Sequence, residues 1–240
     1  MRWIACLAPC LALGLVASCV EVTETARTTR PAPQPAAEPA VPEVTRAKVQ
    51  QFLTVVQRVE PVAERTCRAR APRSNCDFRI VVDDRPGQPV NAYQTLDRTG
   101  RPILAFTLPM IGAVRNADEL AFVMGHEAAH HIAGHIPRQQ QSAALGALVL
   151  GGIAAAAGAG QGVVDQAVNA GAGVGGRVFS KEFELEADAM GTLIAHNSGY
   201  DPVRGVAFFS QIPDPGNRFL GTHPPNAKRV ETVRRVAAGL

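Results

Sequence analysis

The feature that most constrains this chain is the segment His126-Glu127-Ala128-Ala129-His130. On an α-helix, residues four apart lie on one face about one turn from each other, so both imidazole rings can reach the same ion. Zinc hydrolases use this pattern: two histidines hold Zn²⁺, and the glutamate takes a proton from the water that the metal has acidified. The sequence therefore predicts a site for one zinc ion. The alternative is a histidine-rich surface helix without a metal.

The residues around this motif are typical of a helix. Asn116 can cap its start, and Glu119 three residues later completes a variant of the capping box. Apolar residues then recur at three- and four-residue spacing. We expect Pro137 to close the helix near Ile136, because proline is a poor residue for a helix interior.

Two more histidines, His131 and His135, follow the motif closely. They are rotated by about 100° and about 140° from His130, so neither shares the predicted ligand face. We expect these two side chains to contact a ligand, pack in the core or face solvent. A third protein ligand must therefore come from elsewhere in the chain.

A second helix, predicted over Arg177–Asn197, can supply that ligand. Glu184 and Asp188 are four residues apart and share a face, whereas Glu182 and Glu186 point elsewhere. Glu184 could complete the metal site, and Asp188 could accept a ring N–H from a ligand histidine. The alternative is an acidic face in contact with solvent.

The N-terminal 43 residues predict export and attachment to a membrane. Residues 1–18 carry one positive charge and an apolar run too short to span a bilayer, which indicates a secretory signal peptide. Residues 16–19 resemble the bacterial lipoprotein signal, in which Cys19 is lipidated; an ordinary signal with an incidental Cys19 is the alternative. Residues 19–43 would then be the lipidated cysteine and an extended proline-rich linker. Val20 is not the aspartate that favours the inner membrane, so we expect the outer one.

Residues 44–240 predict a single domain of the α+β class, mainly helical with a small antiparallel sheet before the metal helix. The first helix should run over Val44–Cys67, with Pro61 at its end or at a kink. Strands are predicted at residues 77–83, 90–96 and 102–108, the last two joined by a turn at 97–100. An edge of this sheet could pair with an extended substrate.

Cys67 and Cys76 are the only cysteines that follow Cys19. In an exported protein we expect two such residues to form a disulfide. The alternative, a thiolate metal ligand, is weaker because no histidine lies near them in the sequence.

The segment Ser142–Gly176 is rich in glycine and alanine, and Asp165 is its one charged residue. Residues 143–164 are numerous enough to span a membrane, but their many glycines suit a spanning helix poorly. We predict a helical hairpin or a mobile flap close to the active site.

The last predicted helix covers about Asn226–Ala238. Its valines should face inward, and its basic residues should lie on a solvated face, with anionic lipid headgroups as an alternative contact: Lys228, Arg229, Arg234 and Arg235. The net charge of the chain is small, 24 − 21 = +3 with neutral histidines, so a nucleic-acid partner is not indicated.

His223 lies just before this helix, in Thr222-His223-Pro224-Pro225. The rigid prolines would hold its ring in one place, where it could donate to a developing oxyanion. It could instead occupy the open position of the metal and keep the enzyme silent. The alternative is a simple capping role, because prolines are common in a first helical turn.

Two spaced motifs carry a resemblance to a known family. Gly125-His126-Glu127-x-x-His130 followed by Ser180-Lys181-x-x-Glu184-x-x-Ala187-Asp188-x-x-Gly191 resembles the HtpX and CAAX-prenyl endopeptidase family of gluzincin metallopeptidases, with lysine at 181 where arginine is usual. Residues 91–92, 222–225 and 229–230 are similar to positions of its small periplasmic lipoprotein members, and the likeness covers residues 44–237. It implies that His126, His130 and Glu184 bind zinc, that Glu127 is catalytic, and that Asp188 orients a ligand.

The same resemblance implies a membrane-anchored periplasmic zinc endopeptidase that acts in envelope protein quality control, with unfolded or misfolded envelope proteins as substrates. One alternative is a non-catalytic zinc-binding scaffold or chaperone-like lipoprotein. Glu127 argues against it, because a purely structural site does not need that carboxylate. A zinc hydrolase acting on non-peptide amides, such as cell-wall material, is the other alternative.

Overall fold

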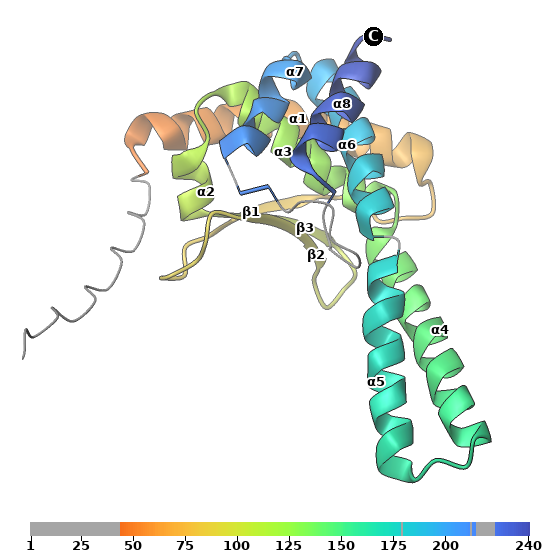
Figure 1. The fold of residues 1–240 in the computed structure, drawn as a ribbon. Coiled ribbons are helices and arrows are strands. Elements are labelled where there is room, and N and C mark those ends of the chain that lie inside the picture. Colours follow the sequence, from red (N-terminus) through yellow and green to blue (C-terminus); the bar gives the residue numbers. More distant parts are fainter. Residues whose placement is uncertain (1–43, 179, 212, 215–223) are drawn as a thin grey trace, which may run out of the picture. The chain divides into compact units, whose positions relative to one another are not determined.

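The computed structural model describes residues 44–178, 180–211, 213–214 and 224–240. The chain divides into two units, Met1–Pro39 and Ala40–Leu240, and all of the described residues belong to the second. The predicted signal peptide, Cys19, the linker up to residue 43 and His223 lie outside the described residues. Within that description the unit is mainly helical and contains one three-stranded sheet (Figure 1).

Helix α1, Arg46–Arg70, begins at Thr45, whose hydroxyl accepts a hydrogen bond from the Lys48 backbone N–H. The helix continues through Pro61 and ends three residues beyond the predicted Cys67. One face of α1 is buried in the core: Phe52, Val55, Val59, Val62, Ala63 and Cys67. This apolar face explains why the helix tolerates an internal proline, since packing contributes more to a helix in a protein than propensity does.

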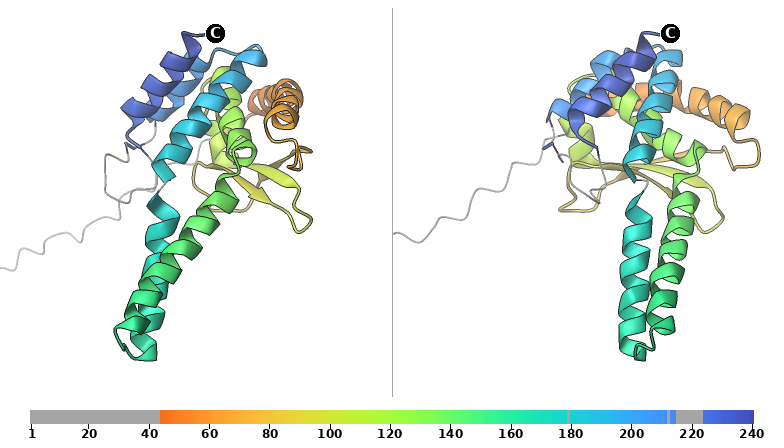
Figure 2. Two further views of the ribbon diagram at one scale, coloured as in Figure 1. Left: turned by 90° about the vertical axis from the view of Figure 1, so that its right-hand side faces the viewer. Right: turned by 45° about the vertical axis from the view of Figure 1, so that its right-hand side comes forward.

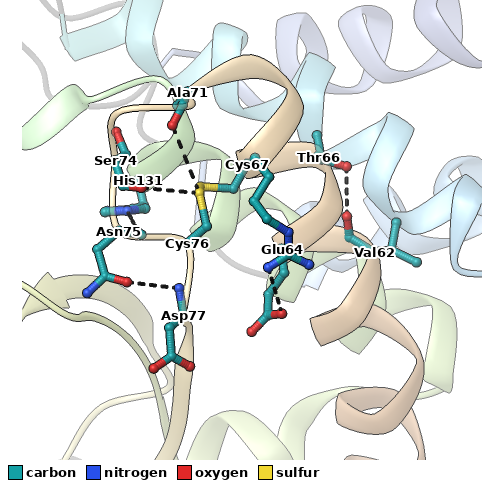
Figure 3. The surroundings of a disulfide bond; sticks show 11 residues. Val62, Glu64, Thr66, Cys67, Ala71, Ser74, Asn75, Cys76, Asp77 and His131 are labelled. Atoms are coloured by element: carbon teal, nitrogen blue, oxygen red, sulfur yellow. Dashed lines mark hydrogen bonds and ion pairs between the residues drawn. A yellow bond between two sulfur atoms is a disulfide. The ribbon is translucent and has the colours of Figure 1, made fainter.

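A disulfide joins Cys67 in the last turn of α1 to Cys76, with Cα atoms 5.6 Å apart (Figure 3). Beside it, the Asn75 side-chain oxygen accepts a hydrogen bond from the Asp77 backbone N–H at 3.0 Å. The Asn75 carbonyl oxygen lies 2.7 Å from Nε2 of His131. The cross-link therefore fixes the end of α1 against the chain that leads into the sheet.

The sheet is mixed, not antiparallel as the sequence predicts. Its strands are β1, Arg79–Asp83, β2, Ala92–Leu96, and β3, Pro102–Thr107, in the order β1-β3-β2. β2 and β3 form the predicted antiparallel hairpin, but β1 pairs in parallel with the other side of β3. The reason is burial, because β3 is the most buried strand and takes the central position between the other two.

Two helices follow the sheet: α2, Leu108–Ala113, and the motif helix α3, Ala117–Ile132. Asn116 caps α3 by accepting hydrogen bonds from the backbone N–H groups of Asp118 and Glu119. The Glu119 carboxylate reaches back to the Arg115 backbone N–H at 2.7 Å, which is one residue beyond the usual capping box. The predicted start of the motif helix is therefore confirmed.

The predicted end of the motif helix at Pro137 is wrong. α3 ends at Ile132, and Gly134 adopts a left-handed conformation (φ 65°) that turns the chain into α4, His135–Ala156. Pro137 lies in the first turn of α4, where the missing N–H has no intrahelical partner to lose. Proline therefore marks the start of the next helix here.

Helices α4 and α5, Gln161–Val178, form a long hairpin (Figure 2). The predicted helical hairpin in the glycine- and alanine-rich segment is thus present. No helix in the described part of the chain combines the length and the apolar character needed to cross a membrane.

The remaining helices are α6, Ser180–Asn197, α7, Pro202–Gly205, the 3₁₀ helix η1, Val206–Gln211, and α8, Asn226–Ala237. α3 lies at the centre of the unit and packs against α1, α6, α7 and β2. α8 packs against α6 (Figure 1). The expectation that Arg229 faces solvent is wrong, because its side chain is 5% exposed and points toward α6 and α3.

Candidate metal centre

The site is built where α3 crosses α6, and two glycines allow this crossing to be close. A Cβ atom added at Gly125 would lie 2.9 Å from the carbonyl oxygen of Gly191, and one added at Gly191 would lie 2.8 Å from the His126 backbone nitrogen. Neither spacing leaves room for a side chain. The close approach brings the acidic segment of α6 beside the histidines of α3.

His126 and His130 on α3 meet Glu184 on α6. Their Nε2 atoms are 3.0 Å apart, and the Glu184 carboxylate oxygens lie 3.6 Å from Nε2 of His126 and 3.4 Å from Nε2 of His130. In the described residues these three side chains form a group whose ligand atoms all lie within 4.8 Å of one another.

The spacing of these atoms fits a zinc ion. Zn²⁺ prefers four ligands in tetrahedral geometry at about 2.0–2.1 Å, so two ligand atoms on one ion are about 3.3–3.4 Å apart. The three separations of 3.0, 3.4 and 3.6 Å bracket this value. Two imidazoles and one carboxylate are also a donor set that zinc accepts, and they would leave a fourth position for water or substrate.

Asp188 holds the ring of His126. Its Oδ1 lies 3.0 Å from Nδ1 of His126, so a proton on Nδ1 leaves Nε2 free to bind an ion. Burial disfavours the charged ring, but hydrogen bonds to Asp188 and then Glu184 outweigh burial and raise the pKa of His126 to about 9. The surroundings therefore stabilise positive charge at this position, as a site for a metal cation must.

Glu127 and the three candidate ligands line one pocket of about 380 Å³. Glu127 is 9% exposed and comes from the same turn of α3 as His126. Apolar side chains form part of the wall, including Phe122 and Phe209, and residues 90–94, which lead into β2 and form its first half, make another part. The pocket thus combines a candidate metal site, a carboxylate and residues of an edge strand.

Comparison with known families supplies the classification. The model of peptidase family M48 matches residues 50–237, which is more than half of the chain. The chain belongs to peptidase family M48. Members of this family are zinc-dependent metallopeptidases, so the chain is a peptidase of this class. No curated protein matches the sequence.

His135 holds the ring of His130, the second candidate ligand histidine. The sequence predicted three possible surroundings for His135: contact with a ligand, the core or solvent. Nδ1 of His135 lies 2.9 Å from Nδ1 of His130, and its Nε2 lies 3.1 Å from the Glu186 carboxylate. Burial lowers the pKa of His135 to about 4, with Glu186 opposing that effect, so the ring is neutral near pH 7. A neutral ring that donates to Glu186 accepts the Nδ1 proton of His130, which leaves Nε2 of His130 free for the ion.

Arg229 of α8 contacts the candidate site, although the sequence predicted its side chain on a solvated face. Its Nε and Nη2 atoms donate to the two oxygens of Asp188 at 2.8 and 2.7 Å, and Nη2 lies 3.3 Å from a Glu184 oxygen. The guanidinium also lies 3.6 Å above the ring of Phe209. A signal was present in the sequence, because Arg229 is four residues before the buried Val233 and so shares its face of the helix.

The other predicted residues lie apart from the pocket. His131 packs its ring edge-on against Phe78, on the side of α3 that faces the disulfide. Cys67 and Cys76 form the cross-link at the end of α1 and are not part of the metal cluster. Cys19 and His223 lie outside the described residues.

Proposed function

We propose that this M48 peptidase is a zinc endopeptidase of the gluzincin type, in which His126, His130 and Glu184 hold one zinc ion. The observation that carries this proposal is the set of three ligand-atom separations near the value expected for tetrahedral zinc. Asp188 and His135 support it, because each contacts the ring nitrogen that a bound ion would not use.

Glu127 is the proposed general base and general acid. When bound, zinc would polarise the substrate carbonyl and lower the pKa of a water molecule in the pocket. The Glu127 carboxylate, on the same turn of α3 as His126, takes the proton from the attacking water. It then returns this proton to the leaving amine of the cleaved peptide bond. Asp188 and Arg229 keep the ring of His126 in place during both steps.

The substrate is proposed to bind as an extended strand beside β2. Among the described strands β2 pairs with β3 alone, so its outer edge offers unpaired backbone groups. Residues 90–94 of this segment line the pocket together with Glu127. Backbone pairing is insensitive to side-chain identity, which suits a peptidase that acts on unfolded chains.

The proposed location is supported by the N-terminal sequence, and the proposed substrates are those that the family resemblance implies. We propose that Cys19 is lipidated, that residues 20–43 act as a tether, and that the domain works on the periplasmic side of the bacterial envelope, at the outer membrane. Unfolded or misfolded envelope proteins are the proposed substrates, which makes the enzyme a component of protein quality control. Intact-mass analysis of membrane-derived protein tests the anchor, since replacement Cys19→Ala should remove the acyl mass and release the protein from the membrane fraction.

Digestion of an unfolded, fluorescently labelled protein tests the chemistry. The purified chain should cleave it, and a chelator should abolish cleavage. Glu127→Gln should keep its zinc and lose roughly 10²–10⁴-fold in turnover. Glu182→Gln is the matched control, because Glu182 is exposed on α6 and should behave as wild type. Equal cleavage by Glu127→Gln would refute the mechanism, and zinc binding without any cleavage by the wild-type chain would favour the scaffold alternative.

A further inference from the structure

The α4–α5 hairpin has its small residues inside and its large apolar residues outside. A Cβ atom added at Gly146 of α4 or at Gly171 of α5 would lie 2.1 Å from the carbonyl oxygen of the other glycine. Gly175 approaches the Ser142 carbonyl oxygen equally closely. The two backbones therefore touch, and no large side chain at these positions separates them. Helices that pack in lipid use small residues at their contacts in this way.

The outer face of α4 is apolar and uncovered in the described residues. Leu145, Leu148, Val149 and Ile153 follow one another at helical spacing, so they share one side of the helix. Leu148 is 72% exposed and Ile153 is 62% exposed. In a helix that packs into a protein core, this stripe would be the buried one.

The exposed side of α5 is more polar than that of α4, although Val163 (56% exposed) and Val174 (42% exposed) also reach the surface. Asp165, Gln166 and Asn169 are exposed there, and the Asp165 carboxylate accepts a hydrogen bond from the Gln161 side chain. α4 and α5 contact each other through their glycines, so their outer faces lie on opposite sides of the hairpin. The two sides of the hairpin thus differ: the exposed large side chains of residues 143–156 in α4 are all apolar, whereas α5 mixes polar residues with valines.

We propose that the apolar face of α4 lies on a lipid surface, with the hairpin parallel to it and Gln166 and Asn169 of α5 on the side that faces water. Residues 143–156 contain no side-chain hydrogen-bond donor or acceptor. A specific protein interface carries about one hydrogen bond for each 100–200 Å². A face without polar side chains therefore suits hydrocarbon better than a protein partner, and amphipathic elements adsorb to lipid in this orientation.

The charges at the base of the hairpin agree with an anionic lipid surface. Residues 139–164 carry no charge, and the nearest charged residues that flank the segment 142–176 are Arg138 and Arg177. Arg177 is exposed, and Arg138 keeps 47% of its side chain exposed while it pairs with Glu186. Basic residues beside an apolar face are attracted to anionic headgroups.

The proposed lipid anchor would bring this face to the same membrane. Residues 20–43 could span up to about 80 Å when extended, which allows the domain to fold back onto the surface that holds Cys19. This step alone rests on the proposed anchor, whereas the apolar face does not depend on it. Because α4 begins at His135, which contacts His130, lipid contact along α4 would hold the pocket close to the membrane.

Tryptophan fluorescence in the full chain tests the proposal at single positions. Leu148→Trp puts a reporter on the apolar face, and Gln166→Trp is the matched control on the polar side of the same hairpin. Trp3, the one native tryptophan, lies in the predicted signal peptide, so it contributes no emission to the processed protein, and in unprocessed protein its emission is subtracted with the parent chain. Vesicles of phosphatidylethanolamine and phosphatidylglycerol should move the emission of Leu148→Trp to shorter wavelength and leave that of Gln166→Trp unchanged.

Three results would overturn the proposal. No vesicle-induced shift at Leu148→Trp, or equal shifts at both positions, would exclude adsorption through the α4 face. A blue-shifted emission that appears without vesicles and grows with protein concentration would assign this face to a second copy of the chain. A shift produced by an unfolded protein but not by vesicles would assign it to substrate binding.

Further variants separate lipid contact from folding and from catalysis. Adding Leu145→Ser to the Leu148→Trp chain should raise the lipid concentration for the half-maximal shift by roughly ten-fold or more. Adding Asn169→Ala, a control at an exposed polar site, should leave it unchanged. Adding Glu127→Gln should also leave the shift unchanged, so a failure of lipid contact and a failure of the peptidase mechanism are distinguishable. Equal lipid concentrations for the Leu145→Ser and Asn169→Ala chains would refute the role of the apolar face.

Discussion

Replacement Arg229→Met should destabilise the domain strongly, although α8 lies far from the motif helix in the sequence. Arg229 donates two hydrogen bonds to Asp188, at 2.8 and 2.7 Å, and both side chains are buried. Methionine keeps much of the apolar stem that packs on Phe209 but removes the guanidinium. The Asp188 carboxylate would then stay buried without its arginine. On α3 the ring of His126 would still contact it.

The size of the effect follows from the desolvated carboxylate. Burial raises the pKa of Asp188, but hydrogen bonds from Arg229 and His126 outweigh it and hold the pKa below its usual value, so the group is ionised near pH 7. Removing one partner of a buried ion pair costs about 3–5 kcal/mol. Because the contact with His126 remains, we expect a loss of unfolding free energy at the lower end of this range, about 3 kcal/mol. In a domain of this size that lowers the melting temperature by roughly 6–12 °C.

Urea unfolding of the metal-free protein measures this loss without interference from zinc affinity. Arg229→Met, Asp188→Asn and the double variant form a cycle, and the double variant should lose less stability than the sum of the single ones. Arg234→Met is the matched control on α8, since Arg234 is exposed and should change stability by less than about 0.5 kcal/mol. Additive losses, or an Arg229→Met variant as stable as this control, would refute the argument for a buried ion pair.

Three further predictions concern the site itself. Glu184→Gln should lose bound zinc, whereas Glu182→Gln should retain it; metal analysis that found the reverse would contradict the ligand assignment. His135→Phe should weaken zinc binding about 10–100-fold, and His135→Gln should recover part of it because its amide oxygen can accept the His130 ring proton, as competition with a chelator would measure. His223→Ala should change turnover at unchanged zinc content, upward if the ring blocks the metal and downward if it stabilises the oxyanion. Unchanged turnover on several unfolded substrates would leave the capping role.

Local signals predicted the motif helix well. The start of α3 depends on Asn116 and Glu119, whose side chains bond to backbone groups within four residues, so spacing alone is informative. The predicted end of α3 was wrong because two residues nearby can each end a helix. Gly134 turns the chain at a positive φ, whereas Pro137 fits the first turn of the following helix. A proline marks a helix boundary without saying on which side of it the boundary lies.

Non-local features were predicted poorly. The parallel pairing of β1 with β3 depends on which strand takes the buried centre of the sheet, and turns between neighbouring strands do not encode that choice. Arg229 was assigned to solvent because an arginine on an isolated amphipathic helix usually belongs there. Its actual partner, Asp188, lies on another helix and 41 residues away in the chain, so the pairing becomes visible only when α6 and α8 pack.

The glycines at the helix crossing explain why the two motifs must be read together. Glycine in a helix interior is less favourable than alanine by roughly 1 kcal/mol, so Gly125 and Gly191 each weaken their own helix. Their benefit lies in the contact, since a Cβ at either position would collide with the backbone of the other helix. That contact sets the depth at which Glu184 meets His126. Each motif therefore contains a glycine that is unfavourable for its own helix but is required for the close approach of the other helix. The presence of both glycines indicates a shared site more strongly than either motif does alone.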